Sequence, residues 1–270
     1  MTAIAVTIAG SDSGGGAGIQ ADLKSFSANS VYGASVLTAL TAQNTLGVTA
    51  IHDVPVEFVR AQIDAVYSDL TVTATKIGML SQVPIIEEVA EGLKRHQTGP
   101  VVLDPVMVAA SGDPLLAESA VATLISKLVP LADIITPNLH EAARMLGGEV
   151  ARNESDMQSQ AKQLIDLGAK AVLLKGGHGD STESADLLAT RDGKFLWLRE
   201  DRIATDNTHG TGCTLSSAIA AGLAKGNALG DAVSSAKAYI HEAIRHADEL
   251  KIGQGHGPVH HFHAFWESAQ

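Results

Sequence analysis

AIAVTIAGSDSGGGAG, the sequence of residues 3–18, joins a run of apolar residues to a loop that is rich in glycine. The Val and Ile content of residues 3–9 predicts a buried first strand, and residues 19–29 have the apolar spacing of a helix. The glycines between them are free to adopt positive φ angles and to let a ligand approach the backbone. The segment therefore predicts a strand, a ligand-binding loop and a helix, the repeating unit of an α/β protein.

The rest of the chain continues this alternation. Strand-like runs recur at residues 35–42, 75–79, 101–105, 134–136 and 171–175. Helical spacing of apolar residues is found at residues 56–70, 83–96, 115–128 and 157–167. A turn at Gly193 predicts a hairpin over residues 183–202, and Ala-rich helices follow over residues 214–250. No repeat or linker divides the chain, so we expect one domain over residues 1–270, with a central, mostly parallel sheet flanked by helices.

The composition is that of an ordinary enzyme, with 45% hydrophobic and 18% charged residues in a chain of 270. A formal net charge of -11 disfavours nucleic acid and anionic membranes as partners. The single cysteine excludes an intramolecular disulfide and fits a reducing compartment, so we expect a cytoplasmic location. We expect neither a signal peptide nor a transmembrane segment, because the apolar runs are too short.

Two familiar nucleotide-binding motifs can be excluded. The only Gly-Lys pair, Gly193-Lys194, is followed by Phe195, so the Walker A pattern is absent. The loop Gly14-Gly15-Gly16-Ala17-Gly18-Ile19 fails at the last position of the dinucleotide fingerprint. A Rossmann dehydrogenase is therefore disfavoured.

A second glycine turn, Thr208-His209-Gly210-Thr211-Gly212-Cys213-Thr214, opens a predicted helix. Unpaired N–H groups and the helix dipole make such a turn an anion site, and the same field lowers the pKa of a thiol in the first helical turn. The alternative is that the glycines only cap a tight turn and that Cys213 packs as a small apolar side chain.

Several motifs occur together, in order, from the first strand to the C-terminal GHGPVHHF. They are Ala9–Lys24, TAQNT at 41–45, KIGML at 76–80, DPVM at 104–107, TPNLHEA at 136–142 and THGTGC at 208–213. In this combination the chain closely resembles the hydroxymethylpyrimidine/phosphomethylpyrimidine kinases of thiamine biosynthesis, which belong to the ribokinase-like superfamily. The resemblance implies a ribokinase-like fold and ATP-dependent phosphorylation of 4-amino-5-hydroxymethyl-2-methylpyrimidine and then of its monophosphate. It also implies a homodimer.

The resemblance implies roles for individual residues. The turn Gly210, Thr211 and Gly212 resembles the anion hole of the superfamily, and Cys213 stands where most sugar kinases of the superfamily have an aspartate base. The residues implied for the pyrimidine pocket are Gln43, Asp22, Gly10, Met79, Val106 and Met107. Those implied for the nucleotide are Asp104, Asn138, Lys175 and Lys237, with Glu141 holding Mg²⁺ through water. An amide such as that of Gln43 suits an aminopyrimidine edge because it both donates and accepts hydrogen bonds.

Other interpretations remain open from the residues. Asp104 can be a turn residue, Glu141 a solvated carboxylate in a first helical turn, and Asp22 a surface charge on a helix. A pyridoxine/pyridoxal kinase would act on a similar hydroxymethyl-bearing ring, and a silent ligand-binding protein could share the fold. The C-terminal histidines 256, 260, 261 and 263 invite a metal site, but no Cys partner or His-Glu-x-x-His pattern accompanies them.

Overall fold

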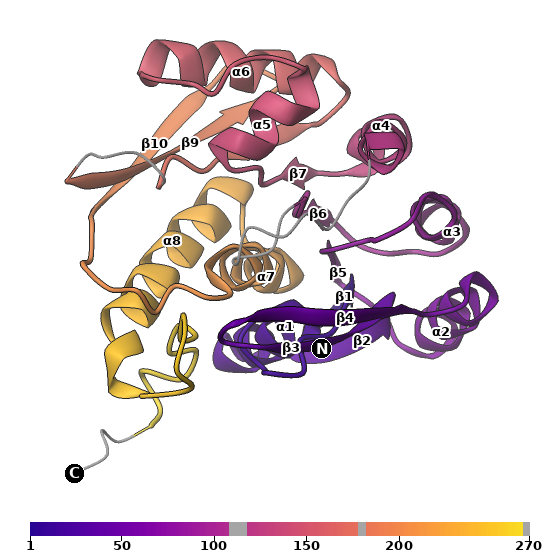
Figure 1. The fold of residues 1–270 in the computed structure, drawn as a ribbon. Coiled ribbons are helices and arrows are strands. Elements are labelled where there is room, and N and C mark those ends of the chain that lie inside the picture. The colour runs from indigo at the N-terminus through magenta and orange to yellow at the C-terminus, as the bar shows by residue number, and fades with distance from the viewer. Residues whose placement is uncertain (108–117, 178–181, 267–270) are drawn as a thin grey trace.

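An eight-stranded sheet forms the centre of the computed structural model, which describes residues 1–107, 118–177 and 182–266 (Figure 1). The strand order is β10-β9-β8-β7-β6-β5-β1-β2. Six strands are parallel, namely β2 (Tyr32–Leu37), β1 (Ile4–Ala9), β5 (Ala74–Ile77), β6 (Val101–Leu103), β7 (Ile134–Ile135) and β8 (Ala171–Leu174). The antiparallel hairpin of β9 (Glu183–Thr190) and β10 (Phe195–Asp201) completes one edge. The predicted mostly parallel sheet and the hairpin are confirmed.

Helices cover both faces of this sheet (Figure 1). One face packs against α2 (Val56–Asp69), α3 (Val83–Arg95), α4 (Glu118–Lys127), α5 (Leu139–Leu146) and α6 (Glu154–Asp166). The other packs against α1 (Gly18–Ala28), α7 (Thr211–Ala224) and α8 (Leu229–Arg245). Apolar side chains from the two faces form two buried clusters, one on each side of the sheet. No helix in the described part of the chain is long and apolar enough to cross a membrane.

The single strand predicted for residues 35–42 is wrong, because the chain breaks at Thr38. There β2 ends, and β3 (Ala39–Asn44) pairs with β4 (Gly47–Asp53) in a separate antiparallel sheet. Thr38 anchors the break, since its N–H donates to Ala9 O and its hydroxyl donates to Met79 O. This small sheet carries the end of β3 toward the carboxyl edge of the main sheet.

Two helices on the first face differ from their predictions for local reasons. For α5 the sequence indicated only a first helical turn at Glu141 and no bounds, because its eight residues are too few for a clear periodic pattern. α6 begins three residues before the predicted start, because the Asn153 side chain accepts a hydrogen bond from Asp156 N and caps the helix. The helix predicted for residues 115–128 is observed as α4, and its positions 115–117 lie outside the described residues.

Candidate active site

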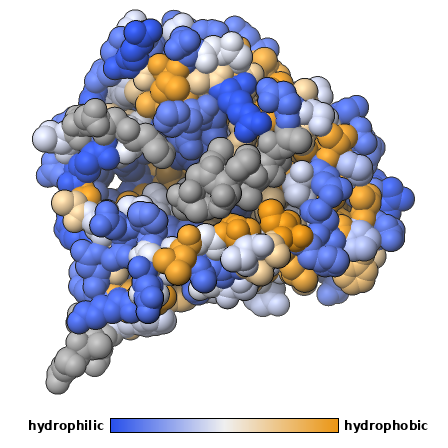
Figure 2. Space-filling view, viewed as in Figure 1, coloured by the Kyte–Doolittle hydropathy of each residue, from blue (hydrophilic) through white to orange (hydrophobic). Residues whose placement is uncertain are grey.

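A pocket of about 550 Å³ lies at the carboxyl edge of the sheet, where the loops after β1, β5, β6, β7 and β8 meet. This is the edge at which open α/β sheets bind ligands, and the volume suits a small molecule. The space-filling view shows a hollow on the side of β10 and α8, with hydrophilic residues around it (Figure 2). The pocket is therefore the candidate site.

Asp12 organises the glycine-rich loop that follows β1. Its carboxylate accepts hydrogen bonds from Gly14 N at 2.8 Å, Gly16 N at 3.0 Å and Ala17 N at 2.8 Å, and it contacts His209 Nε2 at 2.8 Å. Burial acts to raise the pKa of Asp12, but the hydrogen bonds from His209 and from the backbone hold this pKa below its ordinary value. Asp12 is therefore a buried carboxylate that fixes the loop.

The second glycine turn packs backbone to backbone against the first. Gly210 has a φ of 83°, and a Cβ atom there would lie 1.9 Å from Gly16 O, so only glycine fits. A third segment holds the same turn, because His209 N donates to Gly257 O and Val259 N donates to His209 O. The backbone and the side chain of His209 thus both fix the orientation of the turn.

The turn leads directly into α7, which begins at Thr211 and points its N-terminus into the pocket. The first N–H groups of a helix have no partner within the helix, so they can bind an anion here. Cys213 is partly exposed in this first turn. Burial raises the pKa of the Cys213 thiol to about 11, although the charge of Lys76 opposes the rise. The direction of this shift is opposite to the one expected from the helix N-terminus, and desolvation is its largest cause.

Asp104 and Lys175 form a buried ion pair beside the turn. Lys175 Nζ lies 3.1 Å from Asp104 Oδ1, which also accepts a hydrogen bond from Thr136 Oγ1 at 3.0 Å. Burial acts to lower the pKa of Lys175, but Asp104 and Glu141 raise it above its ordinary value. Lys175 is thus a fixed positive charge on the pocket wall, and Asp104 is more than a turn residue.

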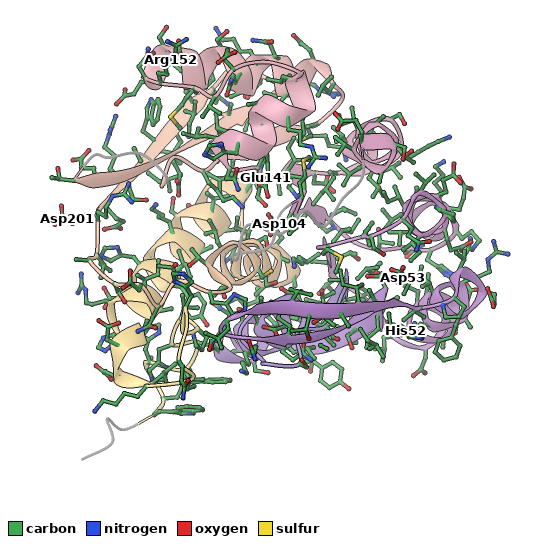
Figure 3. All side chains as sticks on the ribbon, viewed as in Figure 1. His52, Asp53, Asp104, Glu141, Arg152 and Asp201 are labelled. Carbon is green, nitrogen blue, oxygen red and sulfur yellow. The ribbon has the colours of Figure 1, made fainter. Side chains whose placement is uncertain are left out.

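Asn138 and Glu141 form a capping box at the start of α5. Glu141 N donates to Asn138 Oδ1 and Asn138 N donates to Glu141 Oε2, each at 2.8 Å. Glu141 is not a solvated carboxylate, because it is buried, and this burial raises its pKa to about 7 against the charge of Lys175. Figure 3 shows Glu141 and Asp104 in the centre of the molecule, whereas Asp201 lies at the outer end of β10.

Lys237 reaches the pocket from α8 and is already paired. Its Nζ lies 2.7 Å from Asp186 Oδ2 and 3.0 Å from Ser184 Oγ. Asp186 also accepts a hydrogen bond from Gly176 N at 2.9 Å, which ties the loop after β8 to the hairpin. Asp186 therefore holds Lys237 in the same way as Asp104 holds Lys175.

The opposite wall of the pocket is less charged. Gln43, Gly10, Met79 and Val106 all line it, as expected. The Oε1 atom of Gln43 lies 3.1 Å from the hydroxyl of Thr41, and a Cβ atom on Gly10 would lie 2.6 Å from Met79 Cε. This wall suits a flat ring that needs one amide partner.

Two expected pyrimidine-pocket residues lie elsewhere. Met107 is fully buried in the core and does not line the pocket. Asp22 is also fully buried, and both of its carboxylate oxygens lie 2.9 Å from Lys76 Nζ. These placements correct the expectation that Asp22 and Met107 contact the pyrimidine: each lies behind the pocket wall.

Asp12, Lys76 and Asp186 had no predicted role, but all three line the pocket. Asp12 gave a usable signal, since it follows the first strand inside the glycine loop. Lys76 gave a second usable signal, because it is a charged residue within a short buried strand. Asp186 gave none, because an acidic residue in a hairpin is ordinarily exposed.

Comparison with known proteins gives consistent similarities. Residues 12–260 match the family model described as phosphomethylpyrimidine kinase. The hydroxymethylpyrimidine/phosphomethylpyrimidine kinase of Rhizobium meliloti is 61% identical over 267 residues, covering 99% of this chain and 100% of that one. The thiamine biosynthesis bifunctional protein ThiED of Geobacter sulfurreducens is 51% identical, covering 95% of this chain and 51% of its own length. The ADP complex of Bacillus subtilis pyridoxal kinase is similar in structure, with a TM-score of 0.91 and 37% identity over 99% of this chain and 100% of that chain.

Proposed function

The chain belongs to the phosphomethylpyrimidine kinase family, and from this premise we propose a role in phosphoryl transfer for each of the main residues of its pocket. The activity is ATP-dependent phosphorylation of 4-amino-5-hydroxymethyl-2-methylpyrimidine and of its monophosphate, in thiamine biosynthesis. Phosphoryl transfer needs mainly positioning and charge stabilisation. The pocket offers both.

The transferring phosphoryl group binds at the N-terminus of α7. The N–H groups of Gly212 and Cys213, which follow Thr211 in the first helical turn, face its oxygens, and the Lys175 ammonium balances the charge that develops on them. Asp104 holds Lys175 in place through their 3.1 Å contact. Lys237, paired with Asp186, orients the loop at Gly176 more than it neutralises phosphate.

Cys213 takes the proton of the acceptor alcohol. As the substrate hydroxyl oxygen bonds to the γ-phosphorus, the bond from that phosphorus to the β-phosphate oxygen breaks and ADP leaves. The hydroxyl proton passes to Cys213 in its thiolate form, which is the minor form of the free protein at neutral pH, and the thiolate becomes a thiol. Cys213 suits this role because it lies in the same first turn of α7 as the anion-binding N–H groups.

Glu141 would hold Mg²⁺. The donor set fits, because Glu141 brings a buried carboxylate to the pocket wall, and carboxylate oxygen is a ligand that Mg²⁺ prefers. When bound, the ion neutralises part of the negative charge on the nucleotide phosphates. Asn138 keeps the carboxylate in position by capping α5 together with it.

Gln43 orients the pyrimidine against Met79 and Val106. Its amide pairs with the aminopyrimidine edge, while the apolar side chains contact the ring faces. Gly10 leaves the space in which Met79 packs. The hydroxymethyl group then points toward Cys213.

The observation that carries this assignment is the position of Cys213, at the start of α7 in a pocket that Gln43 and Lys175 also line. The test measures ADP formation with the pyrimidine alcohol, its monophosphate and pyridoxal as separate acceptors. We expect the highest kcat/KM values with the two pyrimidines. Turnover with pyridoxal alone would overturn the proposal.

A second activity toward pyridoxal is favoured by one observation, the TM-score of 0.91 to pyridoxal kinase. Pyridoxal also carries a hydroxymethyl group on a heteroaromatic ring. We expect it to act as a slower acceptor that competes with the pyrimidine alcohol. Measurement of its kcat/KM beside that of the pyrimidine checks this.

We also propose a cytoplasmic homodimer. The exposed apolar side chains of Tyr32, Leu40, Ile51 and Phe58, on β2, the small sheet and α2, support an interface there. Sedimentation of the parent chain and of the Leu40→Ser/Ile51→Ser variant tests this, with a shift to monomer expected for the variant. The lone, partly exposed Cys213 thiol suits a reducing compartment, and cell fractionation tests the location.

A further inference from the structure

Lys76 and Asp22 form an ion pair that neither side chain exposes to solvent. Lys76 Nζ lies 2.9 Å from each carboxylate oxygen of Asp22, and the exposed fraction of both side chains is 0%. The cost of removing two charges from water is only partly offset by their attraction, so a buried ion pair is a weak source of stability. The pair therefore invites a functional explanation.

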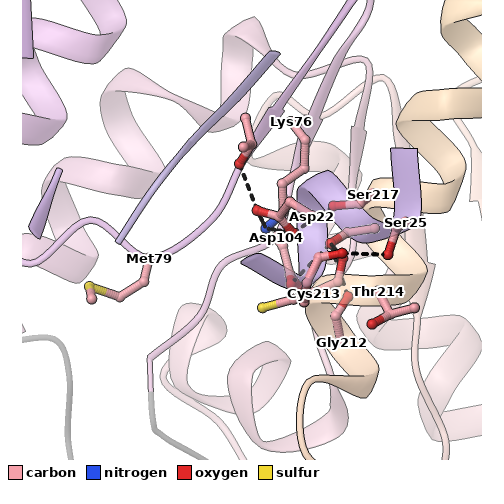
Figure 4. A network of polar contacts seen from close by, with 12 residues as sticks. Asp22, Ser25, Lys76, Met79, Asp104, Gly212, Cys213, Thr214 and Ser217 are labelled. Atoms are coloured by element: carbon pink, nitrogen blue, oxygen red, sulfur yellow. Dashed lines mark hydrogen bonds and ion pairs between the residues drawn. The ribbon is translucent and has the colours of Figure 1, made fainter. Parts of the chain in front are cut away.

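The surroundings of Asp22 place this pair beneath Cys213. The Asp22 carboxylate also accepts hydrogen bonds from Thr7 Oγ1 and Ser217 Oγ, both at 2.6 Å. Ser217 follows Cys213 by four positions on α7, so the two side chains lie on the same face of that helix. Figure 4 shows Asp22, Lys76, Cys213 and Ser217 gathered in one polar network.

Charged groups from four elements interact electrostatically with the Cys213 thiol. Lys76 comes from β5, Asp22 from α1, Asp104 from the end of β6 and Lys175 from the end of β8. Among the charges that act on the pKa of Cys213, Lys76 has the largest effect and lowers it, whereas Asp22 and Asp104 raise it. Burial acts to lower the pKa of Lys76, but Asp22, Cys213 and Asp104 together raise it, so the ammonium stays protonated.

We propose that Lys76 is a positioning residue for phosphoryl transfer, whose ammonium group, fixed by Asp22, stabilises the negative charge on the Cys213 sulfur. The inference rests on the proposed role of Cys213 as the base. In this scheme the proton of the acceptor hydroxyl moves to the sulfur, and Lys76 keeps its own protons throughout. Lys76 borders the pocket, but its side chain is fully buried and its ammonium group is held by Asp22, so it acts through Cys213 rather than on the substrate.

Cys213 is the only cysteine of the chain, so its thiolate can be followed by alkylation without any turnover. The experiment measures the second-order rate constant for iodoacetamide at fixed pH values of the parent and of Lys76→Met. An opposite charge nearby lowers a pKa by about 1–3 units. At pH 8 the variant should therefore react with iodoacetamide at about one tenth of the parental rate or more slowly. The exposed Lys170, which pairs with Asp133 far from the pocket, supplies the matched control Lys170→Met, which should react at the parental rate.

The double variant Asp22→Asn/Lys76→Met removes both charges and leaves no unpaired carboxylate. It replaces Lys76→Met in the experiment if that single variant does not fold. It should also alkylate more slowly than the parent and lower kcat for the alcohol, with the KM for ATP unchanged. Parental alkylation rates in a folded variant would overturn the proposal and mark the pair as structural only. Turnover by Cys213→Ala tests the base separately: if that variant is fully active while Lys76→Met alkylates slowly, the base assignment fails and the charge coupling stands.

Discussion

His209 Nε2 lies 2.8 Å from Asp12 Oδ2, and this contact joins two loops that are 197 positions apart in the chain. Replacing Asp12 with Ala leaves His209 and three backbone N–H groups without their carboxylate. Hydrogen bonds to a charged group are each worth about 1.5–3 kcal/mol, so we expect a clear loss of stability and a higher KM for ATP. Urea unfolding and steady-state kinetics check this, with the exposed Asp69→Asn as the control. A variant with parental KM and stability would show that the contact is dispensable.

His261 makes the stability of the protein dependent on pH. It is buried, its Nε2 lies 3.0 Å from Thr214 Oγ1, and burial lowers its pKa to about 3. In the unfolded chain His261 binds a proton near the ordinary pKa of 6.5, whereas in the folded chain it does so only near pH 3. The contribution of the neutral His261 to the free energy of unfolding is therefore complete above pH 6.5 and is lost as the pH falls toward 3. We expect the free energy of unfolding to fall by at most about 1.4 kcal/mol for each pH unit in this window.

Urea unfolding between pH 4.5 and 7 checks the role of His261. His261→Gln keeps a polar partner for Thr214 but does not titrate, so its stability should change less with pH than that of the parent. The exposed His52 (Figure 3) supplies the control His52→Gln. Equal slopes for the parent and His261→Gln would assign the pH dependence to other groups.

Gln43 should control affinity for the pyrimidine. Loss of a matched polar contact in a pocket costs about 1–3 kcal/mol, so Gln43→Ala should bind the pyrimidine alcohol that much more weakly. Isothermal titration measures this, and the exposed Gln163→Ala serves as the control. Unchanged affinity in folded Gln43→Ala would remove Gln43 from the pyrimidine site.

Glu141 should act through the metal rather than through the pyrimidine. Glu141→Gln keeps a side-chain acceptor for the Asn138 N–H but removes the charge that attracts Mg²⁺. We expect a higher Mg²⁺ concentration for half-maximal turnover and little change in pyrimidine affinity. A Mg²⁺ titration curve that coincides with that of the parent would contradict the assignment.

Cys213 should matter more for the first phosphorylation than for the second. The alcohol must lose a proton, whereas the phosphate oxygen of the monophosphate is largely ionised at pH 7 because its second pKa is about 6. Cys213→Ala should therefore lose about 10²–10⁴-fold in kcat with the alcohol and clearly less with the monophosphate. Saturating kinetics with each acceptor check this. Equal losses would point to a packing role for Cys213 in both steps.

Features that depend on local sequence could be predicted, and features that depend on distant contacts could not. Asp104 and Lys175 were predictable as neighbours because each follows an apolar run, and parallel strands bring such ends to one edge. The break at Thr38 was not, because its hydroxyl bonds to Met79, 41 positions away. Asp22 looked like a surface charge on a helix, and only the fold brings Lys76, 54 positions away, against it.

The thiol of Cys213 illustrates the same limit within a single residue. The field of the helix N-terminus is a local property, which the glycine turn at residues 208–214 indicates from the sequence. The desolvation of the sulfur and the charges that act on it, such as Lys76 and Asp22, depend on contacts that only the fold creates. These contacts reversed the expected direction of the pKa shift.

The close approach of Gly16 and Gly210 determines when the enzyme can become active during its synthesis. A growing chain that ends before residue 210 already contains every strand of the central sheet, together with Gln43, Asp104 and Lys175. It still lacks the helix that would receive the phosphates. Domains generally fold as units, and α7 and α8 cover one face of the sheet, so the fold and the activity are completed only when the last quarter of the chain closes onto the first loop. Truncated products of interrupted translation would therefore be unable to consume ATP at this site.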